Sequence, residues 1–393
     1  MEKKLKFATA ILDFSGRKGG AERYLIDLCK RMAKEGYEVH VYAEHWDEEI
    51  PDIVLHKVNT IPFPKSLRVL SFAIRATKEI EKGNYDVTLG VGNTLKADIL
   101  QPRGGVHWAW FWRSLKAYDN YAIWLIKFLG RVFSPKQWVS GLIEYIAYKD
   151  KNYYKVIAIS DMIKEDMIYW YKIPKEKIIV DYNGIDIEHF HPRNFKYREE
   201  IRKQYGIRDE FVIIFVSNNF RMKGLKYLIK ALAKIKKENL LSLKLLILGR
   251  DKKKPYINLS KKLGIIEEVI FVGSTNSPEK YYAASDLLVH PTFYDACSRV
   301  VLEAMASGIP VITTTSNGAS RIIKNDEEGI VIQDPKNLEA LSKSILFFMD
   351  KEKREKASIR ARQCIERYSF EKNIETIKEI INDILIKRIK NWR

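Results

Sequence analysis

The chain has few of the features that define several common classes of protein. Its 393 residues include only three cysteines, Cys29, Cys297 and Cys364, which lie far apart. This spacing fits neither a disulfide framework nor a zinc site, and it predicts reduced thiols in a cytoplasmic protein. No apolar run approaches the ~20 residues that a helix needs to cross a bilayer. The first residues lead directly into a strand-like run, so we expect neither a signal peptide nor a membrane span.

Metal-binding and nucleotide-binding signatures are also missing. The chain has no Asp-x-Asp pair and no histidine cluster with metal-ligand spacing, and Asp186-Ile-Glu188 falls in an expected linker. Neither the Gly-x-Gly-x-x-Gly dinucleotide motif nor a P-loop is present. We therefore expect any phosphate-bearing ligand to be held without a metal, by basic side chains and a helix N-terminus.

Positive charge is what the chain has in excess. Lysine and arginine total 68 residues against 50 aspartates and glutamates, which gives a formal net charge of +18. Such a surplus indicates an anionic partner: a nucleic acid, an anionic membrane surface or a phosphorylated substrate. Apolar residues make up 46% of the sequence, which is enough for ordinary globular cores, and the length suits two domains.

Short apolar runs alternate with helical patterns along nearly the whole chain, in two series. This alternation predicts an α/β fold of parallel sheets with helices on both faces. We expect doubly wound domains at 1–175 and 176–370, and a final helix, 371–393, that packs back on the first domain. The expected strands are Lys6–Leu12, Tyr37–Ala43, Tyr85–Val91, Ala97–Gln101 and Val156–Ser160, then Phe211–Ser217, Leu243–Gly249, Val269–Gly273, Leu287–Pro291, Val311–Thr314 and Gly329–Ile332.

The most informative stretch begins at Asp295. Seven residues separate this acid from a second one, Glu303, and small residues, a Gly-x-Pro turn and a β-branched strand follow. A helix that begins at Arg299 would present unpaired N–H groups and a positive dipole end to the preceding loop, where phosphates bind. The two acids would then hold different parts of one ligand, as in a nucleoside-diphosphate sugar. The alternative is a charged surface turn before a buried helix.

Two other turns beside predicted strands carry residues suited to anions. The adjacent Gly19 and Gly20, before the first helix, let backbone N–H groups approach an anion closely. Arg221 and Lys223 follow the strand Phe211–Ser217, where side chains point into the ligand crevice of a parallel sheet. Arginine can bind two phosphate oxygens at once, and lysine supplies a compact charge. Ordinary solvated turns would give the same patterns.

Residues 108–154 form a segment rich in aromatic and basic side chains. Trp and Tyr prefer the headgroup region of a membrane, and each Lys or Arg near an anionic surface adds ~1 kcal/mol of attraction. The segment is therefore predicted to bind an anionic membrane surface. The alternative is a helical hairpin that caps the domain and buries its aromatic side chains. The residues expected to face the membrane are Trp108, Trp110, Trp112, Arg113, Lys116, Trp124, Lys127 and Arg131.

Taken together, these motifs resemble the family-four retaining glycosyltransferases of the GT-B fold. Members carry a Glu, seven residues and a second Glu, followed by small residues and Gly-x-Pro-Val, which is similar to the stretch from Asp295 to Val311. The Gly-Gly-x-Glu loop at 19–22, the linker Asn183-Gly-Ile-Asp186 and the stretch Ala284–Pro291 are also similar, so the resemblance covers nearly the whole chain. Within the family the likeness is to the lipopolysaccharide core α-glucosyltransferases.

The resemblance implies two Rossmann-like domains that face a central cleft, and a role for each matching residue. Lys223 would bind the donor diphosphate, and Asp295 would contact the sugar hydroxyls, although the usual residue there is a Glu with one more methylene. His107, which follows two glycines at a strand end, lies where many members place a polar group near the reacting sugar. These three are the candidate catalytic residues. Donor binding is expected at Gly19, Gly20, Arg221, Lys223, Cys297, Ser298, Arg299 and Glu303.

The function implied by the resemblance is retaining, metal-independent transfer of a hexose, with glucose from UDP-glucose as the first candidate. The acceptor would be a lipid-linked glycan, such as the lipopolysaccharide inner core, at the inner face of the cytoplasmic membrane. A polyprenyl, glycerolipid or capsular acceptor is the nearer alternative. A basic nucleic-acid-binding protein is the alternative from another class, but no DNA or RNA module is recognisable, and the acidic pair Asp295 and Glu303 would repel phosphates.

Overall fold

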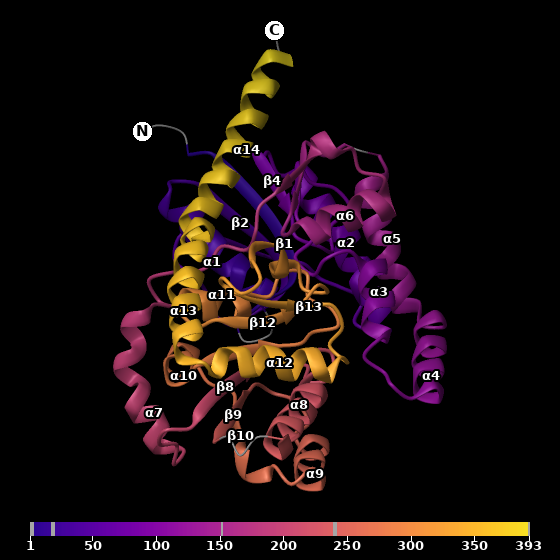
Figure 1. The fold of residues 1–393 in the computed structure, drawn as a ribbon. Coiled ribbons are helices and arrows are strands. Elements are labelled where there is room, and N and C mark those ends of the chain that lie inside the picture. The colour runs from indigo at the N-terminus through magenta and orange to yellow at the C-terminus, as the bar shows by residue number, and fades with distance from the viewer. Residues whose placement is uncertain (1–3, 17–19, 151, 239–241, 392–393) are drawn as a thin grey trace. The chain divides into compact units, whose positions relative to one another are not determined.

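The computed structural model divides the chain into two compact units (Figure 1). One consists of Met1–Tyr182 together with Glu371–Arg393, and the other is Asn183–Phe370. The observed division lies a few residues after the expected boundary at 175, because the last strand of the first sheet extends to Val180. The structure describes residues 4–16, 20–150, 152–238 and 242–391.

The first unit is built on a seven-stranded parallel sheet. Its strands are β1 (Lys6–Phe14), β2 (Glu38–Trp46), β3 (Ile53–Lys57), β4 (Val87–Gly90), β5 (Ile99–Leu100), β6 (Lys155–Ala158) and β7 (Ile178–Val180). They are arranged in the order β3-β2-β1-β4-β5-β6-β7. The direction of winding reverses between β1 and β4, as it does in a doubly wound sheet.

Two of these strands, β3 and β7, are absent from the expected set, and both lie at the edges of the sheet. In β3 no side chain is buried, and the strand lacks the continuous apolar run that marks a buried parallel strand. β7 has only three residues, and the prolines and the Asn-Gly pair around it predict a linker instead of a strand.

Helices cover the sheet of the first unit through apolar stripes. In α1 (Gly20–Lys34) the side chains of Tyr24, Leu28 and Met32 recur every four residues and are fully buried. The other helices of this unit are α2 (Lys65–Lys82), α3 (His107–Leu115), α4 (Tyr121–Val132), α5 (Pro135–Lys149), α6 (Asp161–Tyr171) and α14 (Phe370–Asn391).

The C-terminal helix α14, yellow in Figure 1, is tied to the first unit by polar and apolar contacts. The carboxamide of Asn373 accepts a hydrogen bond from the Tyr24 hydroxyl and donates one to the Asp181 carboxylate. Lys378 pairs with Glu35 at the end of α1. These contacts make the last helix an integral part of a unit whose other elements come from the first half of the chain.

The second unit is built on a six-stranded parallel sheet. Its strands are β8 (Phe211–Val216), β9 (Leu243–Leu248), β10 (Val269–Gly273), β11 (Leu287–His290), β12 (Val311–Thr314) and β13 (Gly329–Ile332). The order β10-β9-β8-β11-β12-β13 reverses between β8 and β11. The prediction of two doubly wound parallel sheets is confirmed. The helices are α7 (Arg198–Gln204), α8 (Leu225–Glu238), α9 (Lys254–Lys262), α10 (Pro278–Ala284), α11 (Arg299–Ala306), α12 (Leu338–Met349) and α13 (Lys351–Ile365).

A glycine allows two neighbouring strands of the second unit to end close together. Gly249 follows β9 with φ +131°, and a Cβ atom on it would lie 1.7 Å from the carbonyl oxygen of Ser217, which follows β8. The overlap is with backbone, so it cannot be relieved by a side-chain rotation. Gly206 provides a contrast, because its φ is +65° and no atom lies within 4 Å of the position of a Cβ.

We expect Gly249→Ala to destabilise the second unit by about 3 kcal/mol or more, and Gly206→Ala by only ~1 kcal/mol, since the second change adds backbone strain without a clash. Guanidinium unfolding followed by far-UV circular dichroism measures both. The seven described tryptophans belong to the first unit, so Trp fluorescence provides an internal control that should not change. Equal losses for the two variants would contradict the clash.

Candidate functional site

The polar residues of the second unit gather where its winding reverses. β8 and β11 are neighbours, so the loops that follow them lie at the same edge of the sheet. Gly224, with φ +77°, makes this approach possible, because a Cβ there would lie 2.1 Å from the carbonyl oxygen of Pro291. The backbone N–H of Phe293 donates a hydrogen bond to the carbonyl oxygen of Met222 (2.9 Å), which joins the two loops.

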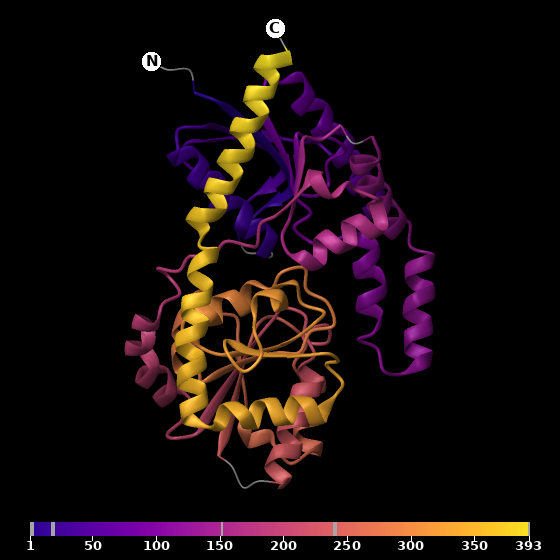
Figure 2. The same ribbon diagram turned by 45° about the horizontal axis from the view of Figure 1, so that its top comes forward.

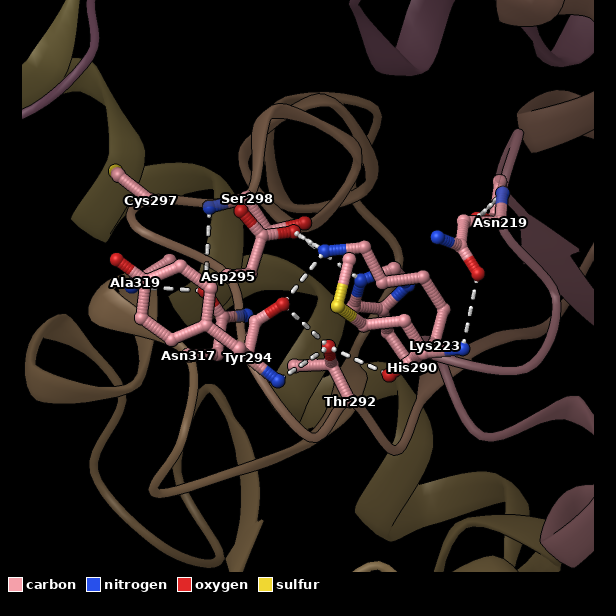
Figure 3. Close-up of polar contacts among 12 residues, drawn as sticks. Asn219, Lys223, His290, Thr292, Tyr294, Asp295, Cys297, Ser298, Asn317 and Ala319 are labelled. Atoms are coloured by element: carbon pink, nitrogen blue, oxygen red, sulfur yellow. Dashed lines mark hydrogen bonds and ion pairs between the residues drawn. The ribbon is translucent and has the colours of Figure 1, made fainter. Parts of the chain in front are cut away.

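Lys223 and Asp295 face each other across these loops (Figure 3). The ammonium nitrogen of Lys223 lies 2.6 Å from Oδ2 of Asp295 and 2.9 Å from the carbonyl oxygen of Tyr294. His290, at the end of β11, places Nε2 3.5 Å from the same carboxylate oxygen. The Lys223 and Asp295 side chains are only 16% and 20% exposed, so the ion pair is held away from bulk water.

The electrostatics of the pair follow from this burial. Burial alone would raise the pKa of Asp295, but the Lys223 ammonium and the neighbouring His290 ring hold that pKa well below its usual range. Burial also lowers the pKa of His290, which favours the neutral imidazole at pH 7. The carboxylate is therefore ionised, and the pair is a salt bridge with a neutral histidine beside it.

The start of α11 is fixed by an asparagine from the loop after β12. The side-chain oxygen of Asn317 accepts hydrogen bonds from the backbone N–H groups of Ser298 and Ala319, each 3.1 Å long, and its nitrogen donates to the Thr313 hydroxyl. The backbone amide of Ser298 is therefore engaged within the unit, and the assignment of Ser298 to donor binding stays a prediction. The carbonyl of Cys297 is also engaged, by the side-chain nitrogen of Asn183 (2.9 Å).

Glu303 lies in the second turn of α11 and is oriented from two sides. The Tyr282 hydroxyl donates a hydrogen bond to Oε2 (2.9 Å), and Nε of Arg299 lies 3.9 Å from Oε1. The Glu303 side chain is mostly buried. Burial and the neighbouring carboxylate raise the pKa of Tyr282, so the hydroxyl stays a donor. The arrangement leaves a preoriented carboxylate that can accept hydrogen bonds from a ligand's hydroxyl groups.

The other residues predicted to bind the donor do not all belong to the second unit. Arg221 is exposed in the loop before Lys223. Gly20 begins α1 in the first unit, and Gly19 lies outside the described residues. Among the described residues, no group of three or more His, Cys, Asp and Glu side chains could hold a metal ion.

His107 belongs to the first unit, where it begins α3. Its ring lies beside those of Trp108 and Trp110, and Nε2 is buried with no hydrogen-bond partner in the described part of the chain. Burial lowers the pKa of His107. The residue lines a cavity of about 380 Å³, together with Glu144, which the sequence analysis did not identify.

The aromatic and basic segment divides into inward-facing and outward-facing parts. Trp108 and Trp110 are half-buried, and Trp108 packs so closely on α5 that a Cβ on Gly141 would lie 2.6 Å from its ring. Arg113 forms a bidentate salt bridge with Asp166, in which both N–O distances are 2.6 Å. Arg131 donates to the carbonyl of Phe111 and to Ser114. These four side chains make contacts within the unit, and the proposal that they also face a membrane stays a prediction.

The outward-facing part is α4, which runs beside α3 (purple in Figure 2). None of the described residues of α4 is buried. The rings of Tyr121, Trp124 and Phe128 stack along it, and Phe128 meets the ring of Trp112 on α3 at 5.8 Å. Several large apolar side chains of α3, α4 and the residues that follow them are exposed, as are two lysines from the predicted set: Trp112, Tyr121, Ile123, Ile126, Leu129 and Phe133, with Lys116 and Lys127. Within the described residues, no helix is both long and apolar enough to span a bilayer.

Comparison with known proteins identifies both halves of the chain. Residues 18–189 match the family described as Glycosyltransferase Family 4, and residues 197–364 match Glycosyl transferases group 1. The sequence is 29% identical to an uncharacterised glycosyltransferase of Methanocaldococcus jannaschii, over 82% of this chain and 83% of that protein. It is 24% identical to the lipopolysaccharide glucosyltransferase WaaG of Escherichia coli, over 82% and 84%.

Solved structures have the same architecture. The crystal structure of WaaG aligns with a TM-score of 0.79 at 22% identity, over 95% of this chain and 99% of that one. The Anabaena protein HepE, crystallised in complex with UDP-glucose, aligns with a TM-score of 0.70 at 19% identity, over 96% of this chain and 100% of that one. These likenesses, and the two sheets, confirm the GT-B fold.

We expect Asp295→Asn to destabilise the second unit by about 3 kcal/mol, because it leaves the Lys223 ammonium buried without its carboxylate. Glu352→Gln removes an exposed i,i+4 pair with Lys356 and should cost less than ~0.5 kcal/mol. Because the folded pKa of Asp295 is depressed, its contribution is present at pH 7 and declines only as the pH falls below ~4. Denaturant unfolding at pH 7 compares the variants, and similar effects would show that the buried pair is not a stabilising contact.

Proposed function

The chain belongs to the GT-B glycosyltransferases, and from this premise we propose that it transfers a hexose from a UDP-sugar to a lipid-linked glycan, with retention at the anomeric carbon and without a metal. Glucose is the first candidate sugar, since the sequence is similar to a lipopolysaccharide glucosyltransferase and a protein of the same fold is crystallised with UDP-glucose. The first candidate acceptor is a lipopolysaccharide inner core or a glycan built on a comparable lipid.

The observation that carries the proposal is the environment of Lys223. Its ammonium group has three N–H donors, and the structure assigns two of them, to Asp295 and to the carbonyl oxygen of Tyr294. The third has no partner among the described residues and can bind a diphosphate oxygen while the salt bridge persists. The lysine lies beyond the carboxyl end of β8, where ligands of parallel sheets bind.

Leaving-group stabilisation follows from this geometry. Departure of the nucleoside diphosphate places negative charge on its oxygens, and a fixed cation near them lowers the barrier by ~3–4 kcal/mol per donor. Lys223 supplies that cation, Arg221 can add a second, and the N-terminal turn of α11 adds backbone dipoles. Asp295 can accept hydrogen bonds from sugar hydroxyls, and Glu303 from the ribose. No covalent intermediate is needed, because the leaving diphosphate can take the proton of the acceptor hydroxyl.

The outward-facing surface of α4 supports association with the inner face of the cytoplasmic membrane. A lipid-linked acceptor requires the enzyme to work at a bilayer surface. Ile123, Ile126 and Phe133 are 48%, 66% and 78% exposed, and the side chains of Lys116 and Lys127 are exposed as well. An interfacial helix combines these features, with apolar side chains among the acyl chains and cations at anionic headgroups.

Lys223→Ala should lower the affinity for UDP at least tenfold and the turnover of UDP-glucose by 10²–10³, since it removes the proposed diphosphate cation. Calorimetry with UDP and release of UDP from UDP-glucose measure the two effects. Lys237→Ala, an exposed lysine in the last turn of α8, is the matched control and should behave as wild type. Circular dichroism must show the Lys223 variant folded at the assay temperature. Unchanged UDP affinity in a folded variant would refute the diphosphate assignment.

Replacing Ile123, Ile126 and Phe133 together by Ser should weaken binding to vesicles of equal parts phosphatidylglycerol and phosphatidylcholine by tenfold or more, because it removes the apolar area that enters the bilayer. Cosedimentation measures the bound fraction. Tyr169→Ser, which removes an exposed aromatic residue on α6, should have no effect. Equal binding of the triple variant and the wild type would rule out α4 as the membrane-binding surface.

A further inference from the structure

The first unit contains a cavity of about 380 Å³ beyond the carboxyl ends of β4 and β5. It lies next to β1, at the point where the winding of this sheet reverses, which is the ligand-binding position in doubly wound folds. Its volume is near the lower end of the range for ligand pockets, ~300–1,000 Å³, so it suits one small polar molecule better than an extended chain. Polar or aromatic residues around it include Glu22, Asn93, Arg103, Trp110, Ser140 and Glu144.

Glu144, on α5, is the most firmly positioned of these residues. Its Oε2 atom accepts two hydrogen bonds, from the backbone N–H of His107 (3.0 Å) and from the Tyr171 hydroxyl (2.6 Å). These partners belong to α3 and α6, so three helices fix the carboxyl group. Its other oxygen, Oε1, has no hydrogen-bond partner among the described residues, and the residue lines the cavity. One oxygen is therefore used by the fold, while the other is left for a ligand.

Burial raises the pKa of Glu144 to about 7, even though the hydrogen bonds from Tyr171 and His107 oppose the shift. Near neutral pH the carboxyl group therefore exists in both forms. The ionised form accepts hydrogen bonds at Oε1, and the protonated form can also donate one. A hydroxyl group, which is both donor and acceptor, can pair with either form.

The other walls of the cavity also suit a sugar. The guanidinium carbon of Arg103 lies 3.2 Å from the centroid of the Tyr24 ring, which holds this cation in place at the cavity wall. Asn93 and Ser140 offer neutral hydrogen-bonding groups, and Trp110 contributes an aromatic surface. Planar polar groups that pair with hydroxyls, next to an aromatic ring for C–H groups, are the chemistry that recognises a pyranose.

We propose that this cavity binds the terminal sugar of the acceptor, and that Oε1 of Glu144 hydrogen-bonds one of its hydroxyl groups and so selects the acceptor. The inference rests on the proposed function, because it names the substrate of the same transfer reaction. Glu144 would be a specificity-determining residue, bound to substrate through one oxygen and to the fold through the other.

The experiment is saturation-transfer NMR on the full chain with the methyl α-glycosides of glucose, galactose and mannose as probes. Glu144→Ala removes the carboxyl group, and Ser140→Trp fills the cavity from the same helix. Leu142→Trp is the matched control, since it adds the same side chain at a position on α5 that is 47% exposed and does not line the cavity. Melting temperatures and UDP affinities are measured for each variant.

At least one of the three probes should bind to the wild type and to Leu142→Trp. Its affinity should fall tenfold or more in Glu144→Ala, and its signal should disappear in Ser140→Trp. If Glu144→Ala does not fold, Glu144→Gln replaces it. The amide oxygen of the glutamine can accept both hydrogen bonds that Oε2 accepts in Glu144. The NH₂ group then takes the position of Oε1 and cannot accept a hydrogen bond, so we expect the affinity for the probe to fall at least threefold. A lower melting temperature with unchanged probe affinity would show a purely structural residue and would overturn the proposal.

The outcomes separate this inference from the proposed function. If the wild type turns over UDP-glucose but gives no glycoside signal, the proposal that the cavity binds the acceptor sugar is refuted and the proposed transferase function is unaffected. Glycoside binding that depends on Glu144, in a protein that neither binds UDP nor uses UDP-glucose, would refute the proposed donor chemistry while the sugar cavity stands.

Discussion

The salt bridge between Lys223 and Asp295 is the constraint on which the second unit depends. A buried ammonium without a counter-charge is costly, and so is a buried carboxylate, so each side chain is tolerated because the other is 2.6 Å away. Under the proposed function the same pair would also solve a problem of binding. A carboxylate beside a diphosphate would repel it, whereas a lysine shared by the two anions keeps the local charge close to balanced. Gly224 is part of this arrangement, because a side chain there would push the lysine loop away from the loop that carries Asp295.

Both units share one topological feature, with different side chains around it. Each sheet reverses its winding beside its first strand, and in each case the loops at that point collect polar groups. In the second unit these groups are dominated by a cation and a carboxylate in a salt bridge, which suits a charged ligand. In the first unit they surround a cavity in which Glu144 keeps one oxygen unpaired among the described residues, which suits a neutral ligand rich in hydroxyl groups. Electrostatics, and not topology, therefore distinguish the two sites.

Much of this architecture is predictable from local sequence. Buried parallel strands are continuous apolar runs, and β10, β12 and β13 begin and end where the sequence predicts. Lys223 is identified as a site residue from its place after a strand, and Asp295 from its spacing to Glu303 and its place before a helix. Their pairing, across 72 positions, depends on which strands are neighbours, and no local pattern specifies that. Glu144 was missed for the same reason, because its partners come from two other helices and its surroundings in sequence indicated only an aromatic, basic segment.

Helix α5 shows why that segment resisted a single interpretation, since its two faces meet different demands. Ser140 and Glu144 lie four residues apart on the face that lines the cavity, whereas Trp138 and Tyr145 are half-exposed on the other face. Composition averages over both faces, so it could not separate the aromatic residues that build the unit from those that face outward. The geometry has a functional consequence. A helix with its side chains is about 10–12 Å across, so a sugar bound at the inner face of α5 would lie within about that distance of the solvent at its outer face.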